Sequence, residues 1–225
     1  MRVMQEIGRK FKVGKATAVF LDRDGTINEE VGYLDRLEKL SIIPGAFEAI
    51  RLINQAGMKA VVISNQSGIA RGYFDEIFVE TVHERIQALL QEQGARIDQF
   101  FYCPHHPTEG IGNYRQACTC RKPEAGLLLR AAKEMDIDLA RSYMVGDMPK
   151  DIEAAGKAGA KGILLRAGEV RDHLRPMKNG ISAPQEPAAL STVTQRPDPS
   201  LTAQPDYIAD NILEAVTWIM KDRQP

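Results

Sequence analysis

The chain has 225 residues and nearly balanced charge, with 29 Lys and Arg against 30 Asp and Glu, a formal net charge of −1. This balance gives the whole molecule no attraction to nucleic acid or to an anionic membrane, so an anionic ligand must be bound by a local group of cations. Hydrophobic residues make up 44% of the chain, as in an ordinary globular protein, and no apolar run approaches the roughly 20 residues of a membrane span.

The amino terminus and the cysteine count both favour a cytoplasmic protein. The first 14 residues carry scattered charges and lack the apolar core of a secretory signal. Three cysteines are an odd number, which argues against a secreted disulfide framework. We therefore expect a cytoplasmic protein without membrane or nucleic-acid partners. Its length fits one domain with elaborations over residues 1–225.

From Thr17 onward the sequence predicts strands that alternate with helices. The strands are short apolar runs, typical of strands buried on both faces of a parallel sheet, at 17–21, 59–63, 99–102, 142–145 and 162–165. The helices have apolar residues at helical spacing, at 44–56, 75–94, 124–135, 151–158 and 210–220. This alternation implies βαβ units, so the expected fold is α/β, a Rossmann-like open parallel sheet with helices on both faces.

The segment 168–205 differs in composition from the rest of the chain. Six of the twelve prolines lie between Pro176 and Pro205, and no Phe, Trp or Tyr occurs between Met144 and Asp206. A segment of this composition cannot bury much surface. We expect a proline-rich surface insertion here.

All three cysteines fall in one short stretch, together with two of the four histidines. They form a Cys-x-His pair and, twelve residues later, a Cys-x-Cys pair: Cys103, His105, Cys118 and Cys120. Zinc prefers four tetrahedral ligands drawn from thiolate and imidazole, which favours a Zn²⁺ site over a chance cluster of thiols. His106 is the rival for the histidine position. Four protein ligands leave no open position, so we expect a structural zinc, with a catalytic zinc as the alternative, on a cysteine loop that spans 103–120.

Carboxylates follow the first predicted strand. Asp22 and Asp24 lie two residues apart, and Gly25 allows the backbone to turn sharply after them. Oxygen ligands of this kind hold a hard cation such as Mg²⁺. In open parallel sheets ligands bind at the carboxyl ends of the strands, so the position agrees with a magnesium site, although an ordinary Asp-rich turn is the alternative.

Three further polar motifs follow later strands or the last cysteine. The run 64–72 reads Ser-Asn-Gln-Ser-Gly-Ile-Ala-Arg-Gly, whose hydroxyl, amide and N–H groups suit phosphate oxygens. Arg121 and Lys122 could clamp a phosphate, and Asp147 and Asp151 lie one helical turn apart. Each motif alone could be a polar loop, a solvated cation pair or a helix cap. Their order along the chain is more specific.

The four motifs together resemble the haloacid dehalogenase superfamily of phosphatases over about two thirds of the chain. The run 64–72, with Cys-Pro-His-His-Pro at 103–107 and Cys-x-Cys-Arg-Lys-Pro at 118–123, is similar to a narrower family, the D-glycero-D-manno-heptose-1,7-bisphosphate 7-phosphatases. The histidinol-phosphate phosphatases are close relatives that usually differ after the Asn-Gln of the second motif. The resemblance implies a capless haloacid dehalogenase-like fold with a zinc-binding loop.

The resemblance also implies roles for individual residues. Asp22 would be the nucleophile that forms an aspartyl-phosphate, and Asp24 the general acid and then base. A catalytic Mg²⁺ would be bound by the Asp22 carboxylate, the Asp24 backbone carbonyl and Asp147. Ser64 and Lys122 would hold the phosphoryl oxygens.

Substrate recognition is implied at six further positions: Glu30, Tyr33, Asn65, Gln66, Ser67 and Arg121. A second phosphate requires a second cation, and the guanidinium of Arg121 can bind one bidentately. Asp151 would orient Lys122 or the surroundings of the metal, or cap a helix. Met148 departs from the family, where a Lys after the metal-binding Asp is common.

The implied activity is removal of the 7-phosphate of D-glycero-D-manno-heptose 1,7-bisphosphate, in the synthesis of ADP- or GDP-heptose precursors, by a monomer that binds a small sugar bisphosphate. A histidinol-phosphate or broader sugar-phosphate phosphatase is the alternative. A phosphoacceptor module without turnover is disfavoured by Asp24, and a zinc-ribbon nucleic-acid binder by the lack of excess positive charge. We further hypothesise that zinc rigidifies the loop that presents Arg121 and Lys122.

Overall fold

The computed structural model describes residues 14–166 and 203–224. Its sheet has six parallel strands in the order β3-β2-β1-β4-β5-β6. The strands, in chain order, are β1 (Ala18–Leu21), β2 (Lys59–Asn65), β3 (Gln99–Cys103), β4 (Tyr143–Gly146), β5 (Lys161–Leu165) and β6 (Tyr207–Ala209). The strand order reverses direction between β1 and β4, and in open α/β sheets this switch point is where ligands bind.

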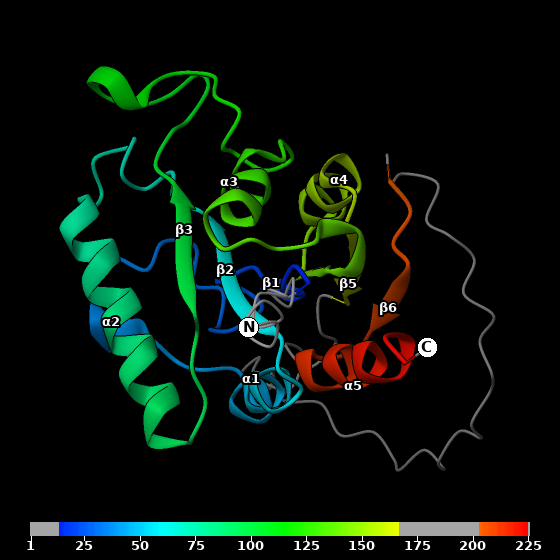
Figure 1. Ribbon diagram of the computed structural model, residues 1–225. Coiled ribbons are helices and arrows are strands. Elements are labelled where there is room, and N and C mark those ends of the chain that lie inside the picture. Colours follow the sequence, from blue (N-terminus) through cyan, green and yellow to red (C-terminus); the bar gives the residue numbers. More distant parts are fainter. Residues whose placement is uncertain (1–13, 167–202, 225) are drawn as a thin grey trace, which may run out of the picture.

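Within the described residues, five α-helices cover the two faces of the sheet (Figure 1). They are α1 (Ala46–Gln55), α2 (Glu76–Glu92), α3 (Gly126–Glu134), α4 (Pro149–Ala158) and α5 (Ile212–Asp222). The single turns η1 (Leu37–Lys39), η2 (Gly112–Tyr114) and η3 (Leu139–Arg141) lie in the connections. One core packs the sheet against α1, α2 and α5, and a second packs the other face against α3 and α4.

Alternation along β1 explains how one short apolar run supplies both cores. Val19 and Leu21 point into the core beside α1, whereas Ala18 and Phe20 point into the core beside α3. All four are fully buried, because successive side chains of a strand point to opposite faces. Burial of each large apolar side chain contributes roughly 1.5–3 kcal/mol. The expected parallel α/β sheet is confirmed.

One strand was not expected from the sequence, and several element ends differ by a few residues. The strand β6 was not expected, because three residues are too short for a periodicity signal. Its place is set by pairing with β5 and by Tyr207. The ring of Tyr207 stacks on the ring of Trp218 in α5, with ring centroids 4.8 Å apart. The helix expected at 124–135 starts later, at Gly126, and the one expected at 151–158 starts earlier, at Pro149.

Two connections at the carboxyl end of the sheet contain no folded domain. Residues 22–45, between β1 and α1, contain only η1, and residues 66–75, between β2 and α2, contain no helix. Neither connection holds a separate cap domain. Most of the proline-rich segment 168–205 lies outside the described residues. None of the helices in the described residues has the length and the apolar run that crossing a membrane requires.

Candidate functional site

The polar residues predicted from the sequence meet at the carboxyl end of the sheet. Asp22 follows β1, Asp147 follows β4, and Ser64 lies near the end of β2. The backbone N–H of Asp22 donates to Val145 O at 2.9 Å, so the residue is held by the neighbouring strand. The site therefore forms at the switch point between β1 and β4, where parallel strands leave a crevice.

Lys122 lies beneath this crevice and is 1% exposed. Its ammonium donates to Ile63 O at 2.8 Å and forms ion pairs with Asp22 Oδ1 at 2.8 Å and Asp151 Oδ1 at 2.7 Å. To reach a phosphoryl oxygen, Lys122 must share or give up one of these contacts. The expectation that Asp151 orients Lys122 agrees with this contact, and Asp151 Oδ2 also accepts from Met148 N at 3.1 Å as a helix cap.

Burial controls the charge of this pair. It raises the pKa of Asp22 to about 7, with Lys122 opposing the shift and Asp151 adding to it. Burial also lowers the pKa of Lys122, but Asp151 and Asp22 more than offset this and raise it above its ordinary value. Both directions are consistent because Lys122 is shared by two carboxylates and cannot neutralise both. The two carboxylates next to Lys122 thus carry more negative charge than its one ammonium can balance.

Asp24 is held in a different way. Its carboxylate accepts from Arg23 at 2.8 and 2.9 Å, from Asn28 Nδ2 at 2.9 Å and from Gln66 Nε2 at 2.9 Å. Burial raises its pKa, but Arg23, Asn28 and Gln66 outweigh burial, so the pKa lies below its usual value. Asp24 is therefore an oriented, ionised carboxylate beside a nucleophile candidate whose pKa is raised.

Two of the expected substrate contacts are engaged with the protein itself. Gln66 Nε2 donates to Ser64 Oγ at 2.7 Å as well as to Asp24, and Gln66 is 3% exposed. The side chain of Asn65 pairs with the backbone of Lys122, donating to its O and accepting from its N, both at 3.0 Å. Gln66 thus joins Asp24 to Ser64, and Asn65 fixes the Lys122 backbone. Their direct contact with substrate stays a prediction.

Three carboxylates could hold a cation. Oxygens of Asp22, Asp147 and Asp151 lie within 4.8 Å of one another. Asp147 Oδ1 is buried and has no hydrogen-bond partner among the described residues, and burial, then Asp151, raises the Asp147 pKa to about 6. A Cβ on Gly25 would lie 2.2 Å from Asp147 Oδ2, so only glycine permits this approach. An orphaned oxygen among crowded carboxylates fits Mg²⁺.

The four ligand atoms of the predicted zinc site also come together. The Sγ atoms of Cys103, Cys118 and Cys120 lie 3.2–3.5 Å apart, and His105 Nδ1 lies 3.4 Å from Cys120 and 3.7 Å from Cys103. The thiols are free, not paired in disulfides. A tetrahedral zinc with bonds of about 2.3 Å to sulfur needs S–S edges of about 3.8 Å, so the cluster is compatible with Zn²⁺ after slight expansion.

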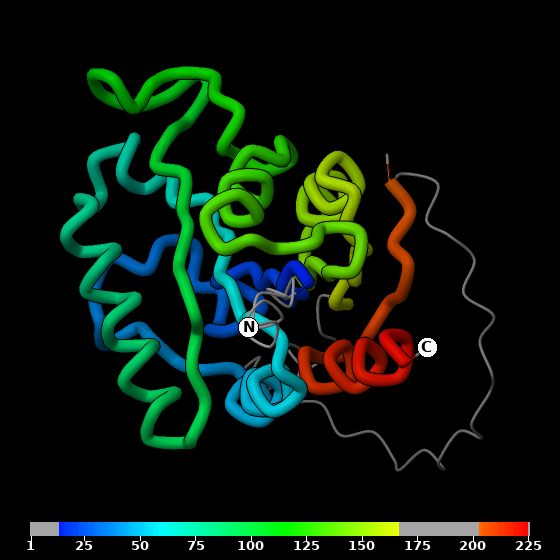
Figure 2. Tube along the Cα trace, viewed as in Figure 1, coloured from blue at the N-terminus to red at the C-terminus, as the bar shows by residue number. Residues whose placement is uncertain are grey.

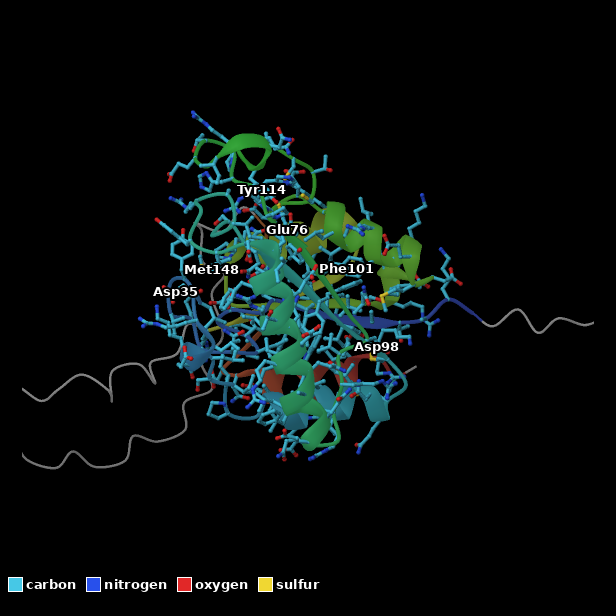
Figure 3. All side chains as sticks on the ribbon, turned by 90° about the vertical axis from the view of Figure 1, so that its left-hand side faces the viewer. Asp35, Glu76, Asp98, Phe101, Tyr114 and Met148 are labelled. Carbon is cyan, nitrogen blue, oxygen red and sulfur yellow. The ribbon has the colours of Figure 1, made fainter. Side chains whose placement is uncertain are left out.

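His106 faces away from this cluster. Its Nδ1 accepts from Glu109 N at 2.9 Å, and its Nε2 lies 3.2 Å from Arg71 Nη2. The preference for His105 over His106 as the ligand agrees with this geometry. The cysteine loop itself rises above the sheet and reaches over the N-terminal end of α2, as the trace in Figure 2 shows. There Glu76 accepts from Tyr114 OH at 2.6 Å and from Tyr102 OH at 2.8 Å (Figure 3).

A pocket of about 540 Å³ opens over Asp22 and Asp24. It also includes the other expected phosphate, metal and substrate residues apart from Lys122, namely Ser64, Asp147, Glu30, Tyr33, Asn65, Gln66, Ser67 and Arg121. Arg121 Nη1 donates to His105 O at 3.1 Å, which ties this cation to the cysteine loop. The assignment of roles to these residues stays a prediction, but all of them border one crevice or lie directly beneath it.

Two residues of the site were missed. Arg23 was assigned no role from the sequence, yet it is 2% exposed and orients Asp24. Lys150 lines the pocket near Met148, and its charge lowers the pKa of Asp147. The signal for Lys150 was present, since it lies in the first turn of α4, three residues after Asp147. Arg23 gave none, because an exposed arginine is the usual case.

Comparisons with known proteins agree with this geometry. The family model described as haloacid dehalogenase-like hydrolase matches residues 3–159. A D-glycero-D-manno-heptose-1,7-bisphosphate 7-phosphatase from Thermosynechococcus vestitus is 41% identical over 92% of this chain and 97% of its own. A D-glycero-beta-D-manno-heptose-1,7-bisphosphate 7-phosphatase from Escherichia coli K12 is 45% identical over 68% of this chain and 80% of its own.

Among solved structures, the D,D-heptose 1,7-bisphosphate phosphatase from B. bronchiseptica, complexed with magnesium and phosphate, superimposes with a TM-score of 0.68. It is 28% identical and covers 92% of this chain and 99% of its own. The resemblance seen in the motifs is confirmed. The chain belongs to the haloacid dehalogenase-like hydrolases and, within them, to the family of the D-glycero-D-manno-heptose-1,7-bisphosphate 7-phosphatases.

Proposed function

We propose that this protein is a phosphatase that removes the 7-phosphate of D-glycero-D-manno-heptose 1,7-bisphosphate. The family supports the reaction, since the relatives from T. vestitus and E. coli are named for it. The observation that carries the proposal is the charge pattern of the pocket. Lys122 is shared by two carboxylates at the reacting end, while Arg121 and Lys150 line the same pocket. Two further cations suit a substrate with a second phosphate.

Asp22 is the nucleophile in this proposal. Its carboxylate forms a bond to phosphorus as the bond from phosphorus to the sugar oxygen breaks, which leaves an aspartyl-phosphate. Lys122, 2.8 Å from Asp22 Oδ1, and the Ser64 hydroxyl lie where they can hold the phosphoryl oxygens. Positioning and charge stabilisation supply most of the rate enhancement in phosphoryl transfer.

Asp24 is the general acid of the first step and the general base of the second. It gives a proton to the departing sugar oxygen and then takes one from the water that hydrolyses the aspartyl-phosphate. Its low resting pKa suits the second step. For the first step, the approaching phosphate dianion raises the pKa, because a nearby like charge favours the protonated carboxyl. Arg23 and Gln66 keep Asp24 oriented during both transfers.

Two metal ions fit the residues present. Asp22 and Asp147, with the Asp24 backbone carbonyl, would hold Mg²⁺, which offsets the repulsion between an anionic nucleophile and an anionic phosphate. The B. bronchiseptica relative is complexed with magnesium and phosphate. The Cys–His cluster would hold a structural Zn²⁺ with no open position. The prediction of a catalytic zinc is disfavoured, because the cluster contributes no residue to the pocket lining.

One experiment tests the reaction and its rival. We would measure phosphate release with Mg²⁺ from the α and β anomers of the heptose bisphosphate and from histidinol phosphate, using wild type and Asp22→Asn. We expect preference for a heptose bisphosphate, and no turnover by Asp22→Asn. Equal or greater activity on histidinol phosphate would show that the substrate assignment is wrong. An active Asp22→Asn variant would show that the mechanism is wrong.

A further inference from the structure

Arg71 has no role in the mechanism, although it belongs to the run 64–72 that distinguishes this family. Ser67 and Gly68 of that run line the pocket, whereas Arg71 is outside the set of lining residues. Its side chain is 24% exposed and is directed toward the cysteine loop. A residue so close to the pocket, but turned away from it, acts on the substrate through its neighbours.

On one side Arg71 contacts the tip of the cysteine loop. Nη1 forms an ion pair with Glu109, and Nη2 lies 3.2 Å from His106 Nε2. The backbones meet at the same place, where Ile111 N donates to Ala70 O at 2.9 Å. A Cβ on Gly110 would lie 2.7 Å from Ala70 O, so the close approach of the two segments depends on glycine.

The segment that carries Arg71 also contacts the pocket. Tyr73, two residues after Arg71, packs edge-on against Tyr33 with ring centroids 4.6 Å apart. Tyr33 lines the pocket. Arg71 therefore ties to the cysteine loop the same short segment that packs against a pocket residue.

Stability alone does not explain these contacts. Glu109 is 55% exposed, and ion pairs open to solvent contribute little to folding. The planar guanidinium instead offers several donors in a fixed fork, which can set the relative position of two loops. Lysine, with one compact ammonium, cannot make the same set of contacts.

We propose that Arg71 is a positioning residue that holds its own segment, and with it the Tyr73–Tyr33 ring pair, against the tip of the cysteine loop at the mouth of the pocket, and so determines affinity for the sugar bisphosphate. The inference rests on the proposed function. It assigns recognition of the sugar bisphosphate in this capless fold to the contact between two loops, which we call the Arg71 contact. The reacting groups, Asp22 and Asp24, are not touched by Arg71.

The test compares Arg71→Met and Arg71→Lys with wild type on two substrates, the heptose bisphosphate and p-nitrophenyl phosphate. Small misplacement of a recognition group costs about 10- to 100-fold, and we expect an increase of this size in KM for the bisphosphate with Arg71→Met. Its kcat, the kinetics on p-nitrophenyl phosphate and the zinc content should stay unchanged. Arg71→Lys should recover part of the affinity. Equal losses on both substrates, or an unchanged KM, would overturn the proposal.

Two controls separate positioning from general effects. Arg130→Met removes another exposed arginine, which pairs with Glu134 on α3 at 2.7 Å and lies outside the pocket lining, and it should change neither substrate. Glu109→Gln should reproduce part of the Arg71→Met effect, and the double variant should lose little more than Arg71→Met, because both changes remove the same contact. If the effects of the two substitutions on KM are fully additive, Arg71 and Glu109 do not act through one contact, which contradicts the proposal.

A further readout does not depend on the substrate. If wild type fails to hydrolyse the heptose bisphosphate, the proposed function is wrong. Hydrogen exchange then tests whether Arg71 holds the two loops together. It is measured at the amides of Ile111 and Gln116, which donate to Ala70 O and His106 O. Faster exchange in Arg71→Met than in wild type or Arg130→Met supports the Arg71 contact. Exchange at the wild-type rate contradicts it.

Discussion

The catalytic cluster and the cysteine loop differ in how they are held. Asp22, Lys122 and Asp151 are nearly buried, and Asp22 follows directly from a strand of the sheet. The cysteine loop is anchored mainly by side chains, at the Cys–His cluster, at Glu76 and at Arg71. Ile111, near its tip, is 63% exposed.

With the proposed function, we expect this difference to separate chemistry from recognition. Groups at strand ends cannot move without disturbing β1 and β4, so the reacting geometry is preorganised by the sheet. A loop held by the Cys–His cluster and a few other side chains can change in sequence without loss of the fold. Changes in the cluster should therefore alter kcat on every substrate, whereas changes in the loop should alter KM on the sugar bisphosphate.

The largest effect is expected from Asp24→Asn. Asparagine can still accept from Arg23 and Asn28, but it cannot carry a proton between the two steps. Loss of general acid–base catalysis typically costs about 10²–10⁴-fold, so kcat on the bisphosphate should fall by this amount with little change in KM. On p-nitrophenyl phosphate, whose leaving group needs no proton, phosphorylated chain should accumulate and be detectable by mass spectrometry.

The matched control is Asp210→Asn, at an aspartate that is 63% exposed and pairs with Arg166. It should behave as wild type. If Asp24→Asn raises KM without lowering kcat, the proposed division between reacting groups and recognition groups is wrong, because Asp24 would then bind the substrate and not act in the chemical step.

Removal of zinc should give the next largest effect. Cys118→Ser removes one of four ligands, so the chain should lose zinc and unfold at a lower temperature. Arg121, which donates to His105 O at 3.1 Å, then loses its support, and KM for the bisphosphate should rise by about 10-fold or more. Thr119→Ser, between two ligands, is the control. If Cys118→Ser loses zinc with turnover and affinity unchanged, the cysteine loop has no part in recognition.

Sequence reasoning was most effective where the physics is local. Asp22 and Asp147 could be placed because parallel strands end at one edge of a sheet, so two motifs more than 100 residues apart in sequence had to meet. The Cys–His cluster followed from ligand chemistry and spacing. In both cases the residue type and its distance from a strand end carried the information.

Sequence reasoning was less informative where the tertiary partner decides the role. Gln66 and Asn65 were expected to contact substrate, which stays a prediction, but the sequence did not show that Gln66 also bridges Ser64 and Asp24 or that Asn65 holds the Lys122 backbone. Which of several amides in a polar loop turns inward depends on tertiary contacts. The buried position of Arg23, paired with its own neighbour Asp24, is likewise visible only in the folded chain.

Magnesium affinity should depend on pH through the catalytic cluster. Without metal, the pKa of Asp22 is about 7 and that of Asp147 about 6. Mg²⁺ binds the carboxylates and not the acids, so protons compete with it, and the apparent affinity should fall about 20-fold from pH 8 to pH 6. Titration calorimetry at constant ionic strength measures this. Affinity that is constant over this range would mean that the two pKa values are not raised.

Substitution of Lys150 should give the smallest change in KM. It is also the sharpest test of the division between reacting groups and recognition groups. By position it belongs to the catalytic cluster, since α4 starts directly after Asp147, yet by charge it belongs to recognition with Arg121. We expect Lys150→Met to raise KM for the bisphosphate about tenfold, the value of one hydrogen bond to a charged group, and to leave p-nitrophenyl phosphate unaffected.

Lys157→Met on the same helix, at a lysine that pairs with Glu124 at 2.6 Å, should change neither substrate. An equal loss on p-nitrophenyl phosphate would have a clear physical meaning. The charge of Lys150 lowers the pKa of Asp147, so an equal loss would show that Lys150 acts through the metal-binding carboxylate. Lys150, at the start of α4, would then belong to the reacting groups. Arg121 would be the remaining pocket cation assigned to recognition of the second phosphate.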